Sequence, residues 1–170
     1  MKVVGMCLVL LGCVGIGFYY RIREVFRYRN LQELLKAMVI LRGEIASMHT
    51  PLPDALLQSA KRTKGITAEF FSAVAGELEE GGGELCVIWQ NKLRDCVPVM
   101  QLREEDRREL EALGETLGYL DVEMQIQSIE LYRRRLEYSI KGMEKESDKR
   151  CRLYPVLGTV AGIVLCILIV

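Results

Sequence analysis

Along the middle of the chain, apolar residues recur at steps of three and four, which is the spacing of a helix with one buried face. The clearest stripe consists of Leu31, Leu34, Leu35, Met38, Leu41, Ile45 and Met48. Charged residues of the same segment fall largely off this stripe. Between Arg21 and Arg152 no segment alternates apolar and polar residues in the manner of a strand. The pattern therefore predicts an all-α fold for this region.

Cap and turn residues divide the region into six helices. The first is expected to end near His49. The second is expected to have Thr50 as its N-cap and Pro51 at its first position, where the missing N–H costs nothing. Thr67 is a suitable N-cap for the third helix. The glycine run at residues 81–83 is expected to break the chain after it.

Proline, glycine and aspartate mark the later boundaries. The fourth helix is expected over about residues 84–96, with Pro98 ending it. The fifth is expected over about residues 103–117, with Gly118 at the C′ position. Asp121 is predicted to cap the sixth and longest helix.

The sixth helix has apolar residues at nearly heptad spacing. Its apolar positions include Val122, Ile126, Ile129, Leu136, Ile140 and Met143, with Arg133 filling the missing slot. This spacing is compatible with a self-associating coiled coil. Packing into the chain's own bundle is favoured, because five short amphipathic helices need a surface against which to bury their apolar faces. The fold expected is an antiparallel bundle of about six helices between two transmembrane helices.

Both ends of the chain lack charge. Residues 3–20 and residues 153–170 are uncharged stretches of 18 residues each. As helices they span about 27 Å, close to the hydrocarbon thickness of a bilayer. A cleaved signal peptide is the alternative for the first stretch, but it would be shorter and end at a small-residue cleavage site. We therefore predict two transmembrane helices at these positions and a helical domain over residues 21–152.

Basic residues adjoin both uncharged stretches on the side of the helical domain. They are Arg21, Arg23, Arg27 and Arg29 after the first stretch, and Lys149, Arg150 and Arg152 before the second. Cytoplasmic flanks of membrane helices carry such an excess of Lys and Arg. The sequence thus predicts a two-pass protein of the cell membrane with its main domain in the cytoplasm.

A G-x-x-x-G step, Gly158 and Gly162, lies in the second uncharged stretch. Small residues at this spacing let membrane helices approach closely, so both glycines are candidates for membrane helix packing. The ordinary frequency of glycine in membrane helices remains an equal alternative.

The composition reflects the same division of the chain. Of its 170 residues, 50% are hydrophobic and 27% are charged. Residues 21–152 hold 22 basic and 23 acidic residues, a net charge of −1. These values exclude a disordered chain and a polybasic protein that binds nucleic acid. The six cysteines form no C-x-x-C motif, so a zinc ribbon or a thioredoxin-like site is not indicated.

Candidate chemistry is sparse. His49 is the only histidine, it has no catalytic partner nearby in sequence, and it stands at a predicted helix end. The glycine run lacks the Gly-Lys-Ser/Thr of a phosphate-binding loop. Acidic runs are interleaved with basic residues, as on a solvated helix face. We expect no catalytic residue, metal ligand, cofactor or small-molecule substrate; a membrane-bound enzyme using His49 is the less favoured alternative.

Two short segments are candidate partner-binding sites. Gly114 lies inside a predicted helix, where glycine costs about 1 kcal/mol relative to alanine and usually allows another backbone to come close. Its neighbours Glu115 and Thr116 supply polar groups for a partner, although tight packing within the bundle explains the segment equally well. Arg133 and Arg134 suit an acidic partner or anionic membrane lipid, and a solvated face is the alternative.

Several of these segments resemble the stage III sporulation protein AB family. They are L-R-G-E-I at residues 41–45, H-T-P-L at 49–52, and L-G-E-T-L-G at 113–118 followed by Asp121 and Gln125. The resemblance covers essentially the whole chain, both uncharged ends included.

The resemblance implies a role in endospore formation. Members of the family act in the mother cell, in the outer forespore membrane, within the channel-like complex that links mother cell and forespore. Their soluble part is similar to the cytoplasmic helical domain of type II secretion F proteins. By this resemblance the partners would be the secretion-type ATPase of the complex and other membrane components of the same operon. The function expected is a non-enzymatic membrane platform or scaffold.

Overall fold

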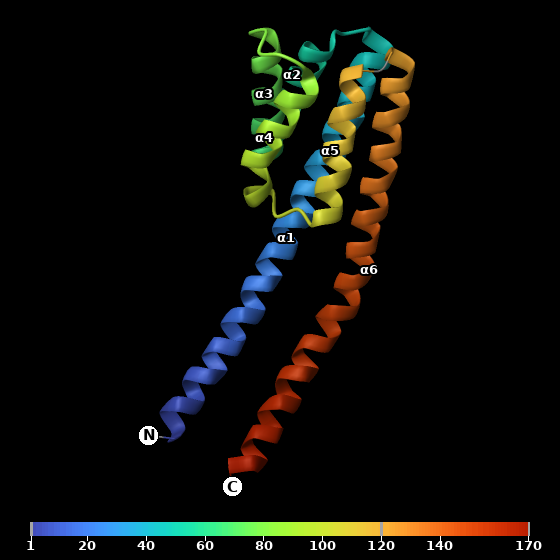
Figure 1. Cartoon of the computed structure of the whole chain (residues 1–170). Helices are drawn as coiled ribbons and strands as arrows, with labels where there is room; N and C mark the ends of the chain where they lie inside the picture. Colours follow the sequence, from blue (N-terminus) through green and yellow to red (C-terminus); the bar gives the residue numbers. More distant parts are fainter. Residues whose placement is uncertain (1, 120, 170) are drawn as a thin grey trace. The chain divides into compact units, whose positions relative to one another are not determined.

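The structure is a computed structural model that describes the backbone of residues 2–119 and 121–169, and the side chains of Tyr19 and of residues 22–118 and 121–145. The described residues form helices and turns without a strand (Figure 1). The helices are α1 (Lys2–Met48), α2 (Leu52–Arg62), α3 (Gly65–Glu79), α4 (Leu85–Met100), α5 (Glu104–Tyr119) and α6 (Val122–Ile169). The prediction of an all-α bundle of six helices is confirmed for this part of the chain.

The chain divides into two compact units, Met1–Leu136 and Glu137–Val170. The first contains α1 to α5 and the beginning of α6. Within it, α1 packs against α2, α3 and α4, and each of α2, α3 and α4 also packs against the next helix in the chain. The second unit is the remainder of α6.

The core of the first unit is built from the predicted stripe of α1 and from aromatic residues of α3 and α4. Leu31, Leu34, Met38 and Leu41 of α1 are fully buried, as are Phe70, Phe71 and Trp89. The two phenylalanine rings meet the Trp89 indole edge to face, with ring centroids 4.8 and 5.8 Å away. Such contacts add to the free energy gained by burying each ring.

The start of α2 differs from the prediction. Its N-cap is Pro51 rather than Thr50, and Pro53 lies in the first turn. The Thr50 hydroxyl lies 3.3 Å from a carboxylate oxygen of Glu44 and donates to it, so it is not aimed at the backbone of α2. The preceding residue, His49, has φ +52°, which turns the chain sharply after α1 and carries Thr50 back towards Glu44.

Two further boundaries were also wrong. Thr67 lies inside α3, which begins at Gly65, and its side chain is buried. Pro98 does not end α4, which continues to Met100. A proline near the end of a helix removes only one backbone hydrogen bond, and Asn30 of α1 holds the end of α4 by donating to the Met100 carbonyl at 2.8 Å.

Gly118 is not a C′ residue either, because α5 includes it and runs to Tyr119. A Cβ atom at Gly118 would lie 3.5 Å from the Cβ of Leu85, in ordinary contact with α4. The predicted break at residues 81–83 is confirmed, with positive φ angles at Gly81 and Gly83 that favour glycine.

On α6 the buried residues keep to the predicted seam except at the slot assigned to Arg133. Ile129, Tyr132 and Leu136 are buried, whereas Arg133 is only partly covered. Tyr132 therefore occupies the slot that the sequence assigned to Arg133. The step from 129 to 132 and then to 136 keeps one face of α6 against the bundle.

The two uncharged ends of the chain remain a prediction. Apart from Tyr19, the side chains of residues 3–20 and 153–170 lie outside the described residues, and so do Gly158 and Gly162. Among the residues that are described, no helix has both the length and the apolarity needed to cross a membrane.

Candidate partner-binding surfaces

Gly114 lies directly beneath an indole ring. A Cβ atom at this position would be 2.2 Å from Cδ1 and 2.6 Å from Nε1 of Trp89. The ring is fixed there by the hydrogen bond that its Nε1 donates to the Leu110 carbonyl at 2.9 Å. The group that comes close to α5 is thus a side chain and not the second backbone that the sequence suggested. Because Gly114 has no side chain, the Trp89 ring of α4 can pack directly against the backbone of α5.

The neighbours of Gly114 point away from this contact. Glu115 is exposed, and one of its carboxylate oxygens accepts a hydrogen bond of 3.3 Å from the Gln90 amide of α4. The Thr116 hydroxyl donates to the Leu113 carbonyl within its own helix at 2.9 Å. Glu115 thus leaves most of its acceptor capacity to solvent or to a partner, while Thr116 is satisfied locally.

Arg133 and Arg134 lie around one carboxylate on α6. Arg133 donates through Nε and Nη2 to the two oxygens of Glu130, at 2.9 and 2.7 Å. Arg134 donates to the same carboxylate at 3.3 Å, and Arg42 of α1 approaches it at 3.5 Å. Hydrogen bonds and charge from Arg133 and Arg134 lower the pKa of Glu130 to about 2. We call these four residues the arginine cluster.

A shallow groove of about 310 Å³ lies beside the arginine cluster. Val39, Arg42, Glu130 and Arg133 line it, so α1 and α6 both contribute to it. Its apolar member, Val39, is 53% exposed. The groove offers a partner one apolar contact surrounded by guanidinium groups.

The two predicted partner sites occupy different helix pairs. Glu115 and Thr116 lie on α5, where Glu115 accepts a hydrogen bond from Gln90 of α4. Arg133 and Arg134 lie on α6, where they share the Glu130 carboxylate with Arg42 of α1. Sequence reasoning missed Arg42, Val39 and Glu130. The spacing of Glu130 from both arginines, three and four residues, was a signal for Glu130, but no local pattern links α6 to α1.

A buried ion pair joins α1 to α5. Arg27 and Asp106 are 5% and 4% exposed, and Nε and Nη2 of Arg27 lie 2.8 and 2.7 Å from one carboxylate oxygen. The backbone N–H of Arg103 donates to the same oxygen at 3.2 Å. Burial, followed by the charges of Asp106 and Glu109, raises the pKa of Tyr132 well above its usual value. The sequence had placed Arg27 in the flank of a membrane helix.

The remaining motif residues serve the fold. An Asp121 carboxylate oxygen accepts a hydrogen bond of 2.9 Å from the Met124 N–H, which is the N-cap interaction predicted for α6. His49 is exposed at the turn after α1. Within the described residues, no group of histidine, cysteine and acidic side chains is arranged to hold a metal ion.

Comparison with known proteins places the whole chain in one group. The family model described as stage III sporulation protein AB matches residues 2–170. The stage III sporulation protein AB of Bacillus subtilis (strain 168) is 28% identical over 169 residues, which are 99% of each chain. A solved structure described as stage III sporulation protein AB (SpoIIIAB) aligns with a TM-score of 0.66 and 30% identity, over 73% of this chain and 98% of that chain. With a match over nearly its full length, this chain belongs to the stage III sporulation protein AB family.

Proposed function

We propose that this protein is a non-enzymatic platform subunit of the sporulation channel complex that links mother cell and forespore. It sits in the outer forespore membrane and docks a secretion-type ATPase on the cytoplasmic side. Family membership supports the place in sporulation. The docking role is supported by the arginine cluster, which carries the proposal.

The arginine cluster has a surplus of positive charge. Arg42, Arg133 and Arg134 contribute three positive charges and Glu130 one negative charge, a net of +2. The Glu130 carboxylate orders the guanidinium groups, and Arg134 remains 72% exposed. Ordered guanidinium groups bind carboxylates through paired hydrogen bonds. The cluster and its groove therefore suit an acidic segment of the ATPase.

Charge reversal at Arg134 tests this docking site. Arg134→Glu should lower spore formation and the yield of a photo-crosslink from position 39 to the ATPase, because it places like charges against the acidic partner. Arg94→Glu on α4 is the matched control, since Arg94 is also exposed and bonds only a residue of its own helix, Asn91, in the described contacts. Equal loss in both variants, or no loss in either, refutes the arginine cluster as the docking site.

Glu115 is the second proposed contact, for a basic segment of the same complex. Glu115→Lys should leave the melting temperature nearly unchanged, because the side chain is exposed and its described partner is a surface glutamine. Spore formation should fall. Glu105→Lys, at another exposed position of α5, is the control. A Glu115→Lys protein that melts much earlier than the Glu105→Lys protein removes this site.

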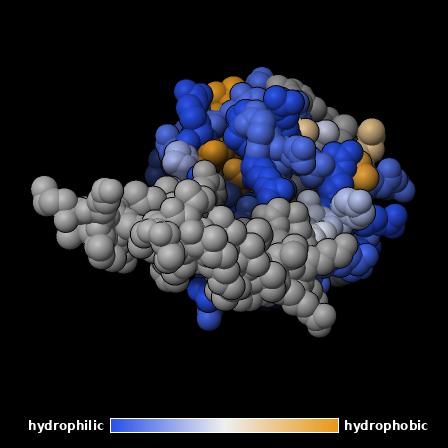
Figure 2. All heavy atoms as spheres, turned by 90° about the horizontal axis from the view of Figure 1, so that it is seen from below, coloured by the Kyte–Doolittle hydropathy of each residue, from blue (hydrophilic) through white to orange (hydrophobic). Residues whose placement is uncertain are grey.

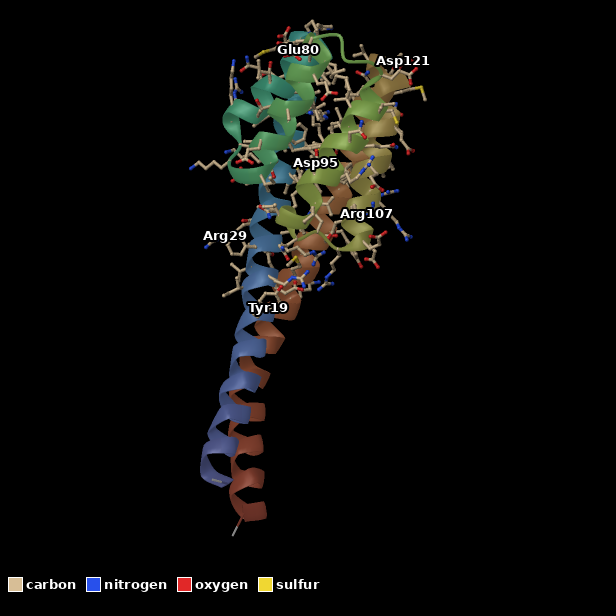
Figure 3. The ribbon with its side chains drawn as sticks, turned by 60° about the vertical axis from the view of Figure 1, so that its left-hand side comes forward. Tyr19, Arg29, Glu80, Asp95, Arg107 and Asp121 are labelled. Carbon is tan, nitrogen blue, oxygen red and sulfur yellow. The ribbon has the colours of Figure 1, made fainter. Side chains whose placement is uncertain are left out.

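The orientation in the membrane is tested by cysteine labelling. Glu80 lies at the exposed turn after α3, as Figure 3 shows. In a variant without the native cysteines, Glu80→Cys should resist a membrane-impermeant thiol reagent in unbroken cells and react after lysis. Labelling in unbroken cells contradicts a cytoplasmic domain.

One observation favours self-association as a second candidate. Met124 and Leu131 lie seven residues apart on α6 and are 49% and 53% exposed. A seven-residue apolar repeat on an exposed face is typical of coiled-coil pairing. Light scattering of residues 30–150 decides this: a monomer at high protein concentration excludes a scaffold built on α6.

A further inference from the structure

One segment of α1 has its polar side turned towards the protein and its apolar side turned outwards. Ile22, Val25 and Phe26 are 40%, 44% and 52% exposed, and Tyr19 is 59% exposed one turn before them. We call these four residues the outer face of α1. Elsewhere the described surface seen in Figure 2 is mainly hydrophilic.

Polar contacts hold the side of this segment that faces the protein, and at its edge the Arg23 guanidinium also lies over the Tyr19 ring, 5.8 Å from the centroid. Arg23 donates to the Gln101 side chain at 2.7 Å, and Arg103 donates to Glu24 at 3.0 Å. Arg27 forms the buried pair with Asp106. These contacts fix the rotation of α1 against the α4–α5 connection, so the outer face cannot turn inwards without breaking them.

A helix at the surface of a protein normally buries its apolar face and exposes its polar face. An apolar environment outside the bundle at this level would stabilise the reversed arrangement. Contiguous exposed apolar patches commonly mark surfaces that meet a protein or a membrane.

We propose that the outer face of α1 is inserted into the interfacial layer of a lipid bilayer, so that the base of the helical domain sits within the membrane surface. This inference rests on the proposed membrane attachment. It extends that attachment from the uncharged residues 3–20 into the folded domain itself.

The lengths along α1 agree with this placement. An uncharged stretch of 18 residues spans about 27 Å, slightly less than a hydrocarbon core of about 30 Å. Continuing the helix by two residues brings Ile22 to the edge of that core. Phe26 then lies about 6 Å further out, a depth at which interfacial helices bury their apolar faces.

On the outer face of α1, charge follows the apolar residues in the same order. Arg29 is the next residue on the outer face, about 10 Å beyond Ile22, and it is exposed. Figure 3 shows it pointing away from the neighbouring helices. An apolar stretch followed by an arginine matches the passage from acyl chains to anionic headgroups.

A second copy of the chain fits this face poorly. A large apolar or aromatic side chain offers roughly 150–250 Å² when fully exposed. The four half-exposed side chains of the outer face therefore supply roughly 400 Å² in total. This is about half of the area that a stable interface buries on each partner. Parallel pairing of two copies would also bring the two Arg29 side chains to the same level. A lipid bilayer provides acyl chains for the apolar face and anionic headgroups for Arg29.

Tryptophan fluorescence in vesicles tests the proposal. The full chain has one tryptophan, the fully buried Trp89, so Phe26→Trp adds a single surface probe. The matched control is Val39→Trp, because Val39 is 53% exposed on the same helix and lies about 20 Å further along it. Both variants are reconstituted into phosphatidylcholine–phosphatidylglycerol vesicles with brominated acyl chains. Ile22→Trp replaces Phe26→Trp if the latter melts earlier than the unsubstituted chain.

The expected result is loss of most of the added fluorescence in Phe26→Trp and no such loss in Val39→Trp. Flotation of the same vesicles reports attachment separately. If the chain floats with the vesicles but both variants are quenched equally, insertion of the outer face is refuted and membrane attachment stands. If the chain does not float, both insertion and membrane attachment are refuted. A third outcome is that the Phe26→Trp probe is shielded from aqueous iodide but is not quenched by lipid. If this shielding rises with the ratio of protein to lipid, the outer face binds a second copy of the chain, and the proposal is refuted.

Discussion

The contact between Gly114 and Trp89 gives the sharpest test of the packing. Gly114→Ala adds one methyl group, which in an open helix position stabilises a protein by about 1 kcal/mol. At this position the methyl carbon would lie 2.2 to 2.6 Å from three atoms of the Trp89 ring, so the ring has to move.

Movement of the ring has two costs. It forces overpacking in a filled core, which costs about 1–3 kcal/mol. It also breaks the bond to the Leu110 carbonyl, which costs about 1 kcal/mol. After subtracting the gain in helix propensity, the net loss is about 1–3 kcal/mol. The melting temperature should fall by roughly 2–12 °C, at about 2–4 °C per kcal/mol for a chain of this size.

Thermal unfolding of the full chain in a mild detergent, followed by circular dichroism, measures this change. Gly43→Ala is the matched control, because a Cβ atom at Gly43 meets nothing within 4 Å and α1 is helical on both sides of it. Gly43→Ala should raise the melting temperature. Trp89→Phe combined with Gly114→Ala should lose less than the two single variants together, since the smaller ring relieves the clash. If Gly114→Ala melts at or above the temperature of the unsubstituted chain, the reasoning is refuted.

Three other changes probe the polar contacts. Arg27→Met alone should cost about 3–5 kcal/mol by leaving Asp106 buried without its partner, whereas Arg27→Met with Asp106→Leu should recover most of the loss in the same melting assay. Asp121→Ala should cost about 1 kcal/mol through loss of the N-cap bond, measured by urea unfolding. The Glu130 carboxyl should titrate near pH 2 in NMR and move towards its ordinary pKa in Arg133→Gln; because the folded-state pKa is lowered, its stabilising effect is present above about pH 4.5 and is lost as pH falls towards 2.

The fold class followed from periodicity, because each helix buries a stripe that repeats in the local sequence. Most of the stripe of α1 is buried as the spacing predicted, but Met48 at its end is 67% exposed and Leu35 is only partly buried. The family resemblance of the L-G-E-T-L-G block is confirmed by the family match. Helix ends were less predictable, since Thr50 and Thr67 both have the chemistry of an N-cap. Whether such a hydroxyl caps a helix depends on the direction of the incoming chain, which His49 and Gly65 set through positive φ angles.

Contacts between distant helices were beyond the sequence for a different reason. Gly114 signalled a close approach, but nothing in a single chain named Trp89 as the group that approaches. The same holds for Arg42, which joins the arginine cluster only because the fold brings it within 3.5 Å of Glu130 on α6. A candidate site composed of side chains from two helices becomes visible only once their rotation and register are known.

Arg27 has a different role in the structure from the one that its position in the sequence suggested. In the sequence it is one of four arginines beside an uncharged stretch, and all four counted equally towards the orientation in the membrane. In the structure its guanidinium is withdrawn into the pair with Asp106. Counting Arg21, Arg23 and Arg29 against Glu24 still leaves a net charge of +2 beside the first stretch, so the positive-inside argument does not depend on Arg27. Its burial instead locks the rotation of α1, and that rotation turns Ile22, Val25 and Phe26 outwards.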